Sequence, residues 1–244
     1  MNPAIALATA WRVLRQLRND PRTIALLVAA PSGLMILLRY VYDGSPQTFD
    51  RIGLSLLGIF PLVTMFLVTS VAMLRERTTG TLERLFTTRL AKLDLLVGYA
   101  LAFAVTTCVQ VGVVSLIAFG WLGLDAPAGL AWVLALALAS ALLGMALGLL
   151  TSAFAATEFQ AVQFLPAVVL PQFLLCGLLT PRSQMVDVLR WLSNVLPMSY
   201  AVEGLARVRQ GVVDAVLIRD LVVVTGCIVL ALALGAATLR RQTS

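Results

Sequence analysis

Long apolar runs, separated by short polar segments, dominate this chain. A helix needs ~20 apolar residues to cross a hydrocarbon core of ~30 Å. Six runs of about this length or longer occur: Thr23–Tyr40, Gly53–Leu74, Leu95–Trp121, Leu130–Ala153, Ala161–Leu179 and Val216–Leu239. The pattern predicts an all-α polytopic membrane protein with six transmembrane helices, and residues 1–244 as a single membrane domain.

The composition supports a lipid environment. Of the 244 residues, 60% are hydrophobic and only 12% are charged, whereas soluble domains carry about 25% charged residues. The chain therefore has too little polar surface to cover a globule in water. Its net charge of +6 comes from arginines that lie mainly beside the ends of the predicted spans. This distribution is typical of membrane proteins, so we expect no nucleic-acid binding.

The positive-inside rule favours a cytoplasmic N-terminus and C-terminus. In that orientation the inner segments contain 11 of the 18 basic residues. Most of the other basic residues fall in the long segment between the fifth and sixth spans, where the rule is weaker. We therefore expect a multi-pass protein with both termini in the cytoplasm.

The segment before the first span, residues 1–21, has the pattern of an amphipathic helix. Its apolar residues recur at helical spacing, and Arg12, Arg15 and Arg18 lie off that stripe. We expect this helix to lie in the cytoplasmic headgroup layer and to end near Pro21. The alternative is a frayed basic tail. The apolar stripe comprises Leu7, Ala10, Trp11, Leu14 and Leu17.

A second helical segment, residues 182–214, separates the fifth and sixth spans. It contains an apolar stripe, and Pro197 can begin a further helix at its first position. We expect two short helices folded at the outer interface. The stripe comprises Met185, Val188, Leu189 and Leu192.

Prolines and glycines mark particular places inside the spans. Pro31 and Gly33 are expected to interrupt the first span, and Pro61 the second, with neighbouring helices compensating for the breaks. Gly144 and Gly148 form a G-x-x-x-G pattern in the fourth span. This pattern lets another helix approach closely.

The chemistry that many enzymes and transporters need is missing from the sequence. No phosphate-binding G-x-x-x-x-G-K-[ST] loop occurs, there is no histidine, and the three cysteines have no metal-binding spacing. The span centres carry no charge, although ion-coupled transporters normally place ionisable residues there. The acidic residues nearest the bilayer are interpreted as caps or interfacial partners: Asp94, Glu158 and Asp220. Transport by this chain would therefore need an external source of energy.

The polar connection after the second span, residues 75–93, is predicted to form a cytoplasmic coupling segment. After the break at Thr79–Gly80, Leu82, Leu85 and Phe86 begin an apolar stripe at helical spacing. A short cytoplasmic helix would explain this pattern. The alternative is a loop that follows the membrane surface with its charges solvated.

Three stretches carry a resemblance to a known family. They are Arg75–Leu85 (RERTTGTLERL), Gln163–Pro181 (QFLP through CGLLTP) and Leu196–Leu205 (LPMSYAVEGL). In this order they resemble the membrane subunits of type 2 ABC exporters, which are related to the G subfamily of ABC transporters. The first is similar to an E-x-x-x-G-T-x-E-x-L segment after span two. The second matches a proline-broken span five, and the third is similar to an outer helix.

The resemblance implies a transporter assembled from several subunits. Two permeases would pair, as identical copies or as siblings, above two separate ATP-binding subunits. ATP and Mg would bind to those partners, so this chain would need no cofactor or metal and would not be an enzyme. The expected contacts with the ATP-binding subunits are Arg75, Glu76, Arg77, Thr78, Thr79, Gly80, Thr81, Leu82, Glu83, Arg84 and Leu85.

The same resemblance suggests a pathway between spans two and five. Leu178 and Leu179 stand where the G subfamily closes its pathway toward the outside. The residues expected to line the pathway are Thr64, Thr69, Gln163, Pro166 and Gln172. Apolar walls with so few polar groups favour a lipophilic or amphipathic substrate such as a drug, an antibiotic or a lipid.

We therefore expect an ABC exporter permease in contact with membrane lipid, in the plasma membrane of a bacterium. One alternative is a non-transporting sensor or scaffold subunit of a cell-envelope complex. Another is an ion-coupled secondary transporter, which the uncharged span centres disfavour.

Overall fold

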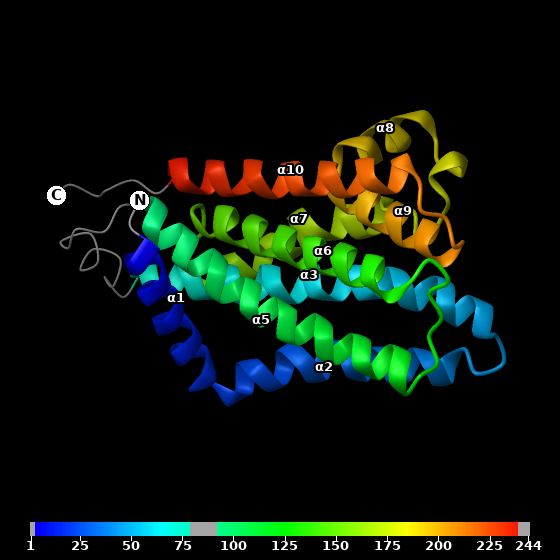
Figure 1. The fold of residues 1–244 in the computed structure, drawn as a ribbon. Helices are drawn as coiled ribbons and strands as arrows, with labels where there is room; N and C mark the ends of the chain where they lie inside the picture. Colours follow the sequence, from blue (N-terminus) through cyan, green and yellow to red (C-terminus); the bar gives the residue numbers. More distant parts are fainter. Residues whose placement is uncertain (1–2, 79–91, 239–244) are drawn as a thin grey trace.

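The computed structural model describes residues 3–78 and 92–238 as a bundle of long helices that run side by side (Figure 1). The described part contains helices, turns and no strand. In chain order the helices are α1 (Pro3–Arg18), α2 (Pro21–Val41), α3 (Pro46–Thr78), α5 (Lys92–Gly120), α6 (Leu130–Ser152), α7 (Glu158–Leu175), the 3₁₀ turn η1 (Arg182–Gln184), α8 (Asp187–Val195), α9 (Pro197–Arg209) and α10 (Ala215–Thr238). The predicted all-α class is confirmed.

Six of the helices, α2, α3, α5, α6, α7 and α10, are long and apolar enough to cross a membrane, as predicted. Two of them end elsewhere than the sequence suggested. The 33 residues of α3 extend ~50 Å at 1.5 Å per residue, well beyond a hydrocarbon core. Helix α7 stops at Leu175, because Gly177 adopts a φ of 95° that turns the chain out of the helix.

The predicted proline breaks are wrong. Helix α2 continues through Pro31, α3 continues through Pro61, and α7 continues through Pro166 and Pro171. A proline removes one backbone donor, but packed neighbours keep a membrane helix continuous around it.

Helices α3 and α6 form the centre of the bundle, where two glycines allow their backbones to approach closely. A Cβ atom at Gly144 would lie 2.1 Å from the Leu62 carbonyl oxygen of α3. One at Gly148 would lie 2.5 Å from the Phe66 oxygen. The G-x-x-x-G prediction is therefore confirmed, and its partner is α3 of the same chain.

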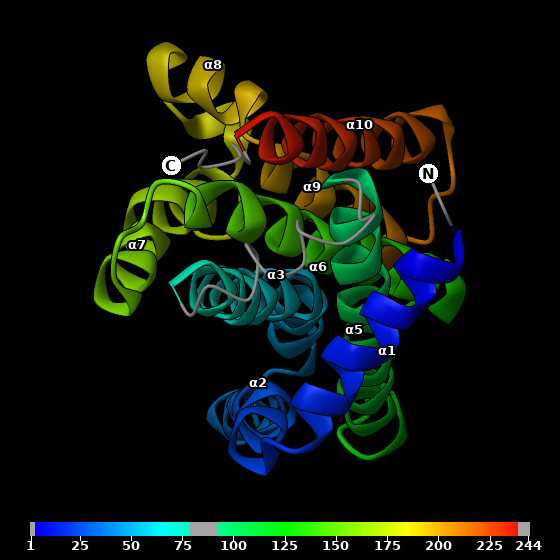
Figure 2. The ribbon, with the colours of Figure 1, turned by 90° about the vertical axis from the view of Figure 1, so that its left-hand side faces the viewer.

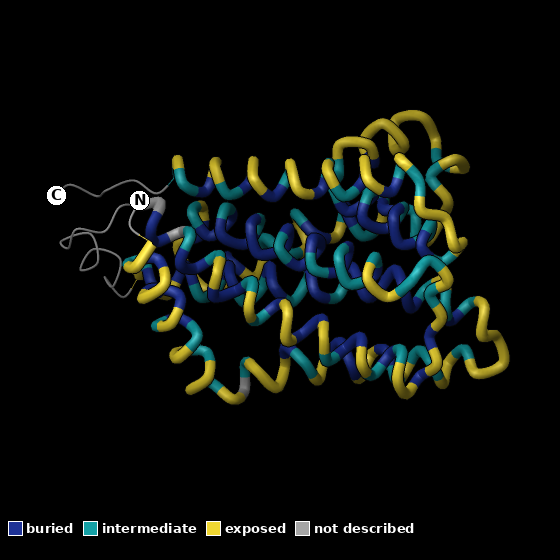
Figure 3. Tube along the Cα trace, viewed as in Figure 1, coloured by how far each residue is buried: buried dark blue, intermediate teal, exposed yellow. Residues whose placement is uncertain are grey.

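The other spans surround this centre and leave apolar faces exposed (Figures 2 and 3). In the most apolar window of each span, 67% of the residues are buried in α3 and α6, against 22% in α2, 17% in α7 and 22% in α10. Lipid tails are as apolar as leucine, so such faces suit either lipid or another membrane subunit.

The two predicted short helices after α7 are present as α8 and α9, and Pro197 begins α9. Helix α9 also packs into the core. Its Met198, Ala201, Leu205 and Val208 are at most 1% exposed, in a cluster shared with α3, α6 and α10. We call this end of the bundle the α9 end, and the opposite end the α1 end (Figure 1).

Helix α1 forms as predicted, and one of its faces packs against the protein. Ala6, Ala10 and Val13 are buried, whereas Leu7 and Trp11 are 62% and 70% exposed. The α1 backbone approaches α5 closely, since a Cβ at Gly98 would lie 2.8 Å from the Ala6 oxygen. The small side chains therefore face the protein, and contact between the large apolar residues and lipid remains a prediction.

Candidate functional site

The last turn of α3 contains the described part of the predicted ATP-binding-subunit contact. Arg75, Glu76, Arg77 and Thr78 are helical and lie at the α1 end. The rest of that segment, Thr79–Leu85, lies outside the described residues, so its helix remains a prediction. The structure thus shows how the start of the segment is held.

Glu76 joins α3 to α1 and α5. Its carboxylate accepts hydrogen bonds from the Arg12 guanidinium at 3.0 and 3.3 Å, and Arg12 also donates to the Tyr99 hydroxyl at 3.0 Å. The amide of Gln16 lies 3.5 Å from the same carboxylate. The Glu76 side chain is only 10% exposed, and a buried charge requires such partners.

The charge balance of this cluster keeps Arg12 protonated. Burial by itself lowers the pKa of Arg12, but the neighbouring Tyr99 and Glu76 outweigh that effect and raise it. The Arg12 guanidinium also lies 5.9 Å from the centre of the Tyr99 ring, within the range of a cation–π contact. Arg12 therefore provides a positive charge to the link between α1, α3 and α5.

Two further arginines join the same turn to α6 and α7. Arg75 donates to both carboxylate oxygens of Glu158 at the start of α7, at 2.7 and 3.1 Å. Arg77 donates to the Ser152 carbonyl at the end of α6. The expectation that Glu158 is an interfacial partner is confirmed. The end of α3 is thus tied by side chains to α1, α5, α6 and α7.

A groove of about 700 Å³ opens beside this cluster, between α1, α2, α3 and α5. Gln16, Asp20, Arg75 and Glu76 lie along its polar part, and leucine, valine and phenylalanine side chains line most of the rest. The groove extends to Thr64 near the middle of α3. Such a combination suits a molecule with a polar head and an apolar body.

Thr64 also lines a second cavity of about 400 Å³, which lies between α2, α3 and α7 and includes Pro166. The Gln110 amide donates to the Thr64 hydroxyl at 2.6 Å and to the Leu27 carbonyl at 3.0 Å. Gln110 therefore links α5 to α3 and α2 beside Thr64, the residue that lines both the groove and the second cavity.

The other predicted pathway residues lie elsewhere. Thr69 is fully buried and its hydroxyl contacts the Met145 carbonyl of α6 at 3.3 Å. Gln172 is 3% exposed and donates to the Val168 carbonyl within α7. Gln163 lies on the exposed face of α7. Within a single chain, the structure brings Thr64 and Pro166 together and separates the other three.

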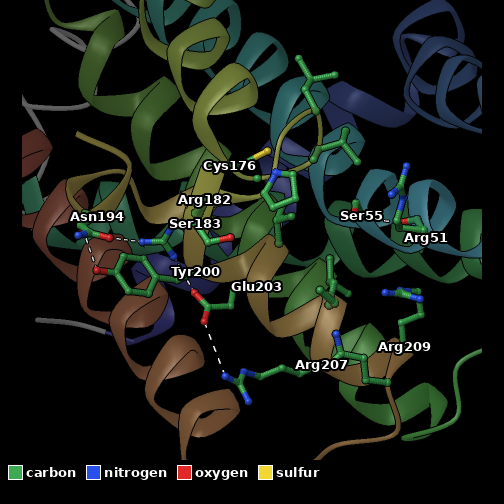
Figure 4. Close-up of a pocket in the computed structure, with 18 of the residues that line it drawn as sticks. Arg51, Ser55, Cys176, Arg182, Ser183, Asn194, Tyr200, Glu203, Arg207 and Arg209 are labelled. Atoms are coloured by element: carbon green, nitrogen blue, oxygen red, sulfur yellow. Dashed lines mark hydrogen bonds and ion pairs between the residues drawn. The ribbon is translucent and has the colours of Figure 1, made fainter. Parts of the chain in front are cut away.

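Leu178 and Leu179, the predicted gate, lie in the turn after α7. Leu178 is half-buried and Leu179 is 61% exposed. Both line a cavity of about 1000 Å³ at the α9 end, together with Cys176 and a group of arginines (Figure 4). Burial raises the pKa of the Cys176 thiol, which suits a packing role rather than reactivity.

Sequence reasoning missed several residues that organise these regions. Arg12 was placed only off the apolar stripe of its helix, Tyr99 and Gln110 carried no local signal, and Arg51 and Arg209 contributed only to the predicted topology. Arg12, Tyr99 and Gln110 act through partners distant in the sequence, such as Arg12 and Glu76, which are 64 positions apart. Within residues 3–78 and 92–238, no three metal-ligating side chains come together.

Comparisons with known proteins agree with this architecture. Residues 6–208 match the family model described as ABC-2 type transporter. The chain is also 30% identical over 134 residues to ABC transporter G family member 20 of Dictyostelium discoideum, an alignment that covers 55% of this chain and 18% of that protein. Because the family model matches most of its length, the chain belongs to the ABC-2 type transporter family of multi-pass membrane proteins.

Proposed function

We propose that the chain is the membrane permease of an ATP-driven exporter for a lipophilic or amphipathic compound. Two permeases, identical or sibling, would form the pathway, and two ATP-binding subunits would dock at the α1 end. ATP and Mg would bind to those partners. The α1 end would face the cytoplasm, with both termini there, in a bacterial plasma membrane.

The observation that carries this proposal is the set of charged contacts at the end of α3. Arg12–Glu76 and Arg75–Glu158 join the last turn of α3 to α1 and α7 at 3.0 and 2.7 Å. The segment expected to contact the ATP-binding subunit follows directly after this turn. A push on that segment would therefore act on several helices together.

The hollows support the substrate class. The groove beside Glu76 combines polar side chains with apolar walls, and Thr64 connects it to the cavity that contains Pro166. Helix α2 lines both hollows and α7 lines the second, and these spans have only 22% and 17% of their most apolar windows buried. A second permease covering that surface would enclose the hollows in a shared pathway, with Leu178 and Leu179 toward the outside as its gate.

The test is the Glu76→Gln variant, which removes the charge and preserves the shape. We would co-express the chain with the ATP-binding protein encoded beside its gene, and measure co-purification, ATP hydrolysis and ATP-dependent flux in proteoliposomes. Hydrogen bonds to charged groups contribute about 1.5–3 kcal/mol, so transport per ATP should fall by about tenfold. Arg39→Gln, at the α9 end, is the matched control.

The outcomes separate the alternatives. Normal flux in Glu76→Gln would refute the proposed route of coupling. Absence of both a co-purifying ATP-binding subunit and ATP-dependent flux would overturn the exporter function and favour the non-transporting scaffold.

A further inference from the structure

The cavity at the α9 end has an unusual concentration of positive charge. Its volume is about 1000 Å³, and six arginines line it against a single acidic residue, Glu203. The arginines come from α3, the turn after α7, α8, α9 and α10, which are far apart in the sequence. They are Arg51, Arg182, Arg190, Arg207, Arg209 and Arg219.

Four of these arginines have a carboxylate partner. Arg182 pairs with Glu203 at 2.6 Å, and Arg190 pairs with Asp187. Arg207 pairs with Asp214 and Arg219 with Asp220, each at 2.6 Å. These pairs neutralise most of the charge, and three of their four acids lie outside the cavity lining.

Arg51 and Arg209 are different. Among the residues that the structure describes, neither has an ion pair. Two of the six arginines in the cavity wall, which Figure 4 labels, therefore have no carboxylate partner within the described part of the chain.

Several arginine donors in this cavity also lack acceptors. The Nε atoms of Arg182, Arg207 and Arg209 are buried and have no hydrogen-bond partner within the described part of the chain. A buried donor without an acceptor is costly. An anion with several oxygens would supply both the missing acceptors and the missing negative charge.

We propose that this cavity binds a phosphate-bearing anion. Guanidinium groups bind phosphate through paired hydrogen bonds. The cavity wall also contains Leu178, Leu179, Val202 and Leu205, so an apolar chain attached to the phosphate has a place beside it. The group that binds is a phosphate, either in the head group of an anionic lipid or as free phosphate. Binding at this site does not depend on transport activity.

The experiment uses the purified full chain in detergent, with its partner subunit where one co-purifies. Binding of dihexanoyl-phosphatidylglycerol, dihexanoyl-phosphatidylcholine and inorganic phosphate is measured by calorimetry. The variant is Arg51→Gln with Arg209→Gln, which leaves every ion pair of the cavity intact. Arg39→Gln is the control, because Arg39 lies at the same end and pairs with Asp43 outside the cavity.

The expected result is binding of the anionic lipid at least about tenfold tighter than the zwitterionic one, and at least about tenfold weaker in the double variant. The control should stay within about twofold of the native chain. Competition by inorganic phosphate would show that the phosphate group suffices, and failure to compete would identify a lipid head group.

Folding of the variant is checked separately. Removing two unpaired like charges relieves repulsion, so the melting temperature without anion should not fall. Equal binding of both lipids, or equal binding by the native chain and a folded double variant, would refute the site. If the double variant does not fold, stabilisation of the native chain by the anionic lipid and not by the zwitterionic one decides the question.

Discussion

The close approach of α3 and α6 gives a specific prediction about Gly144. Replacing it with alanine adds one Cβ atom, which would lie 2.1 Å from the Leu62 carbonyl oxygen and 2.8 Å from the Leu62 Cα. Ordinary contacts of a Cβ atom begin near 3.4 Å. The obstacle is backbone, so no side-chain rotation relieves it, and α3 and α6 must separate.

The magnitude follows from two opposing effects. Overpacking a close contact costs about 1–3 kcal/mol and occasionally more, and a backbone clash belongs at the upper end. Alanine gains at most about 1 kcal/mol of helix propensity over glycine. We therefore expect Gly144→Ala to destabilise the chain by about 2 kcal/mol.

The matched controls are Gly112→Ala and Gly226→Ala. Both glycines lie within helices, and a Cβ at either would meet no atom within 4 Å. The controls should gain up to about 1 kcal/mol, a difference from Gly144→Ala of about 3 kcal/mol. For a chain of this size each kcal/mol shifts the melting temperature by about 2–4 °C, so roughly 6–12 °C should separate the variants.

Thermal unfolding in detergent, followed by tryptophan fluorescence and by retention on a sizing column, measures this difference. If Gly144→Ala melts together with the two controls, the α3–α6 contact is looser than the structure shows.

Three further predictions concern residues expected to act in transport. Replacing Leu82 and Leu85 with serine should preserve membrane levels but reduce co-purification of the ATP-binding subunit and transport, since each buried leucine contributes about 1.5–3 kcal/mol; unchanged binding and flux would refute the contact. A single cysteine at position 178 or 179, with Cys108, Cys176 and Cys227 replaced by alanine, should yield an oxidised permease dimer, because a disulfide needs Cα atoms within ~7 Å. Replacing both Leu178 and Leu179 with alanine should make the pathway leak. Absence of any cross-link, with normal transport in the alanine variant, would indicate that these leucines face lipid.

The length and apolarity of the runs sufficed to predict the six spans. A helix that crosses lipid must satisfy its own backbone hydrogen bonds, so a long apolar run has few alternatives. The boundaries were harder. The sequence could not show that Gly177 adopts a positive φ, or that α3 would extend beyond the apolar run to Thr78.

The sequence pattern of α1 did not indicate which of its faces packs against the protein, for a physical reason. In water, large apolar residues mark the buried side of a helix. Near a membrane they can face lipid, and small residues such as Ala6 and Ala10 take the protein contacts because they permit close approach. The proline breaks were wrong because the compensation by neighbouring helices that we expected is complete, and α3 stays helical through Pro61.

The candidate sites were only partly accessible from sequence. The sequence pattern predicted a contact segment that includes Arg75–Thr78, but not that Glu76 pairs with Arg12, which also donates to Tyr99. Charge pairs between distant positions depend on the packing of whole helices. The arginine cavity illustrates this most clearly, because five separate elements contribute its charges and the sequence shows them only as scattered residues.

Helix α3 connects the two ends of the molecule on which these proposals rest. At the α1 end its last turn is held by Arg12 through Glu76, and near its middle Gly144 of α6 contacts its backbone. Toward the α9 end, a Cβ at Gly58 would lie 2.8 Å from a methyl group of Leu205 in α9. A continuous helix is stiff along its axis, so a displacement at Thr78 would be carried to α9 and hence to the wall of the arginine cavity. We therefore expect substitutions at Glu76 to alter anion binding at the opposite end when the ATP-binding subunit is present, and to leave it unchanged when that subunit is absent.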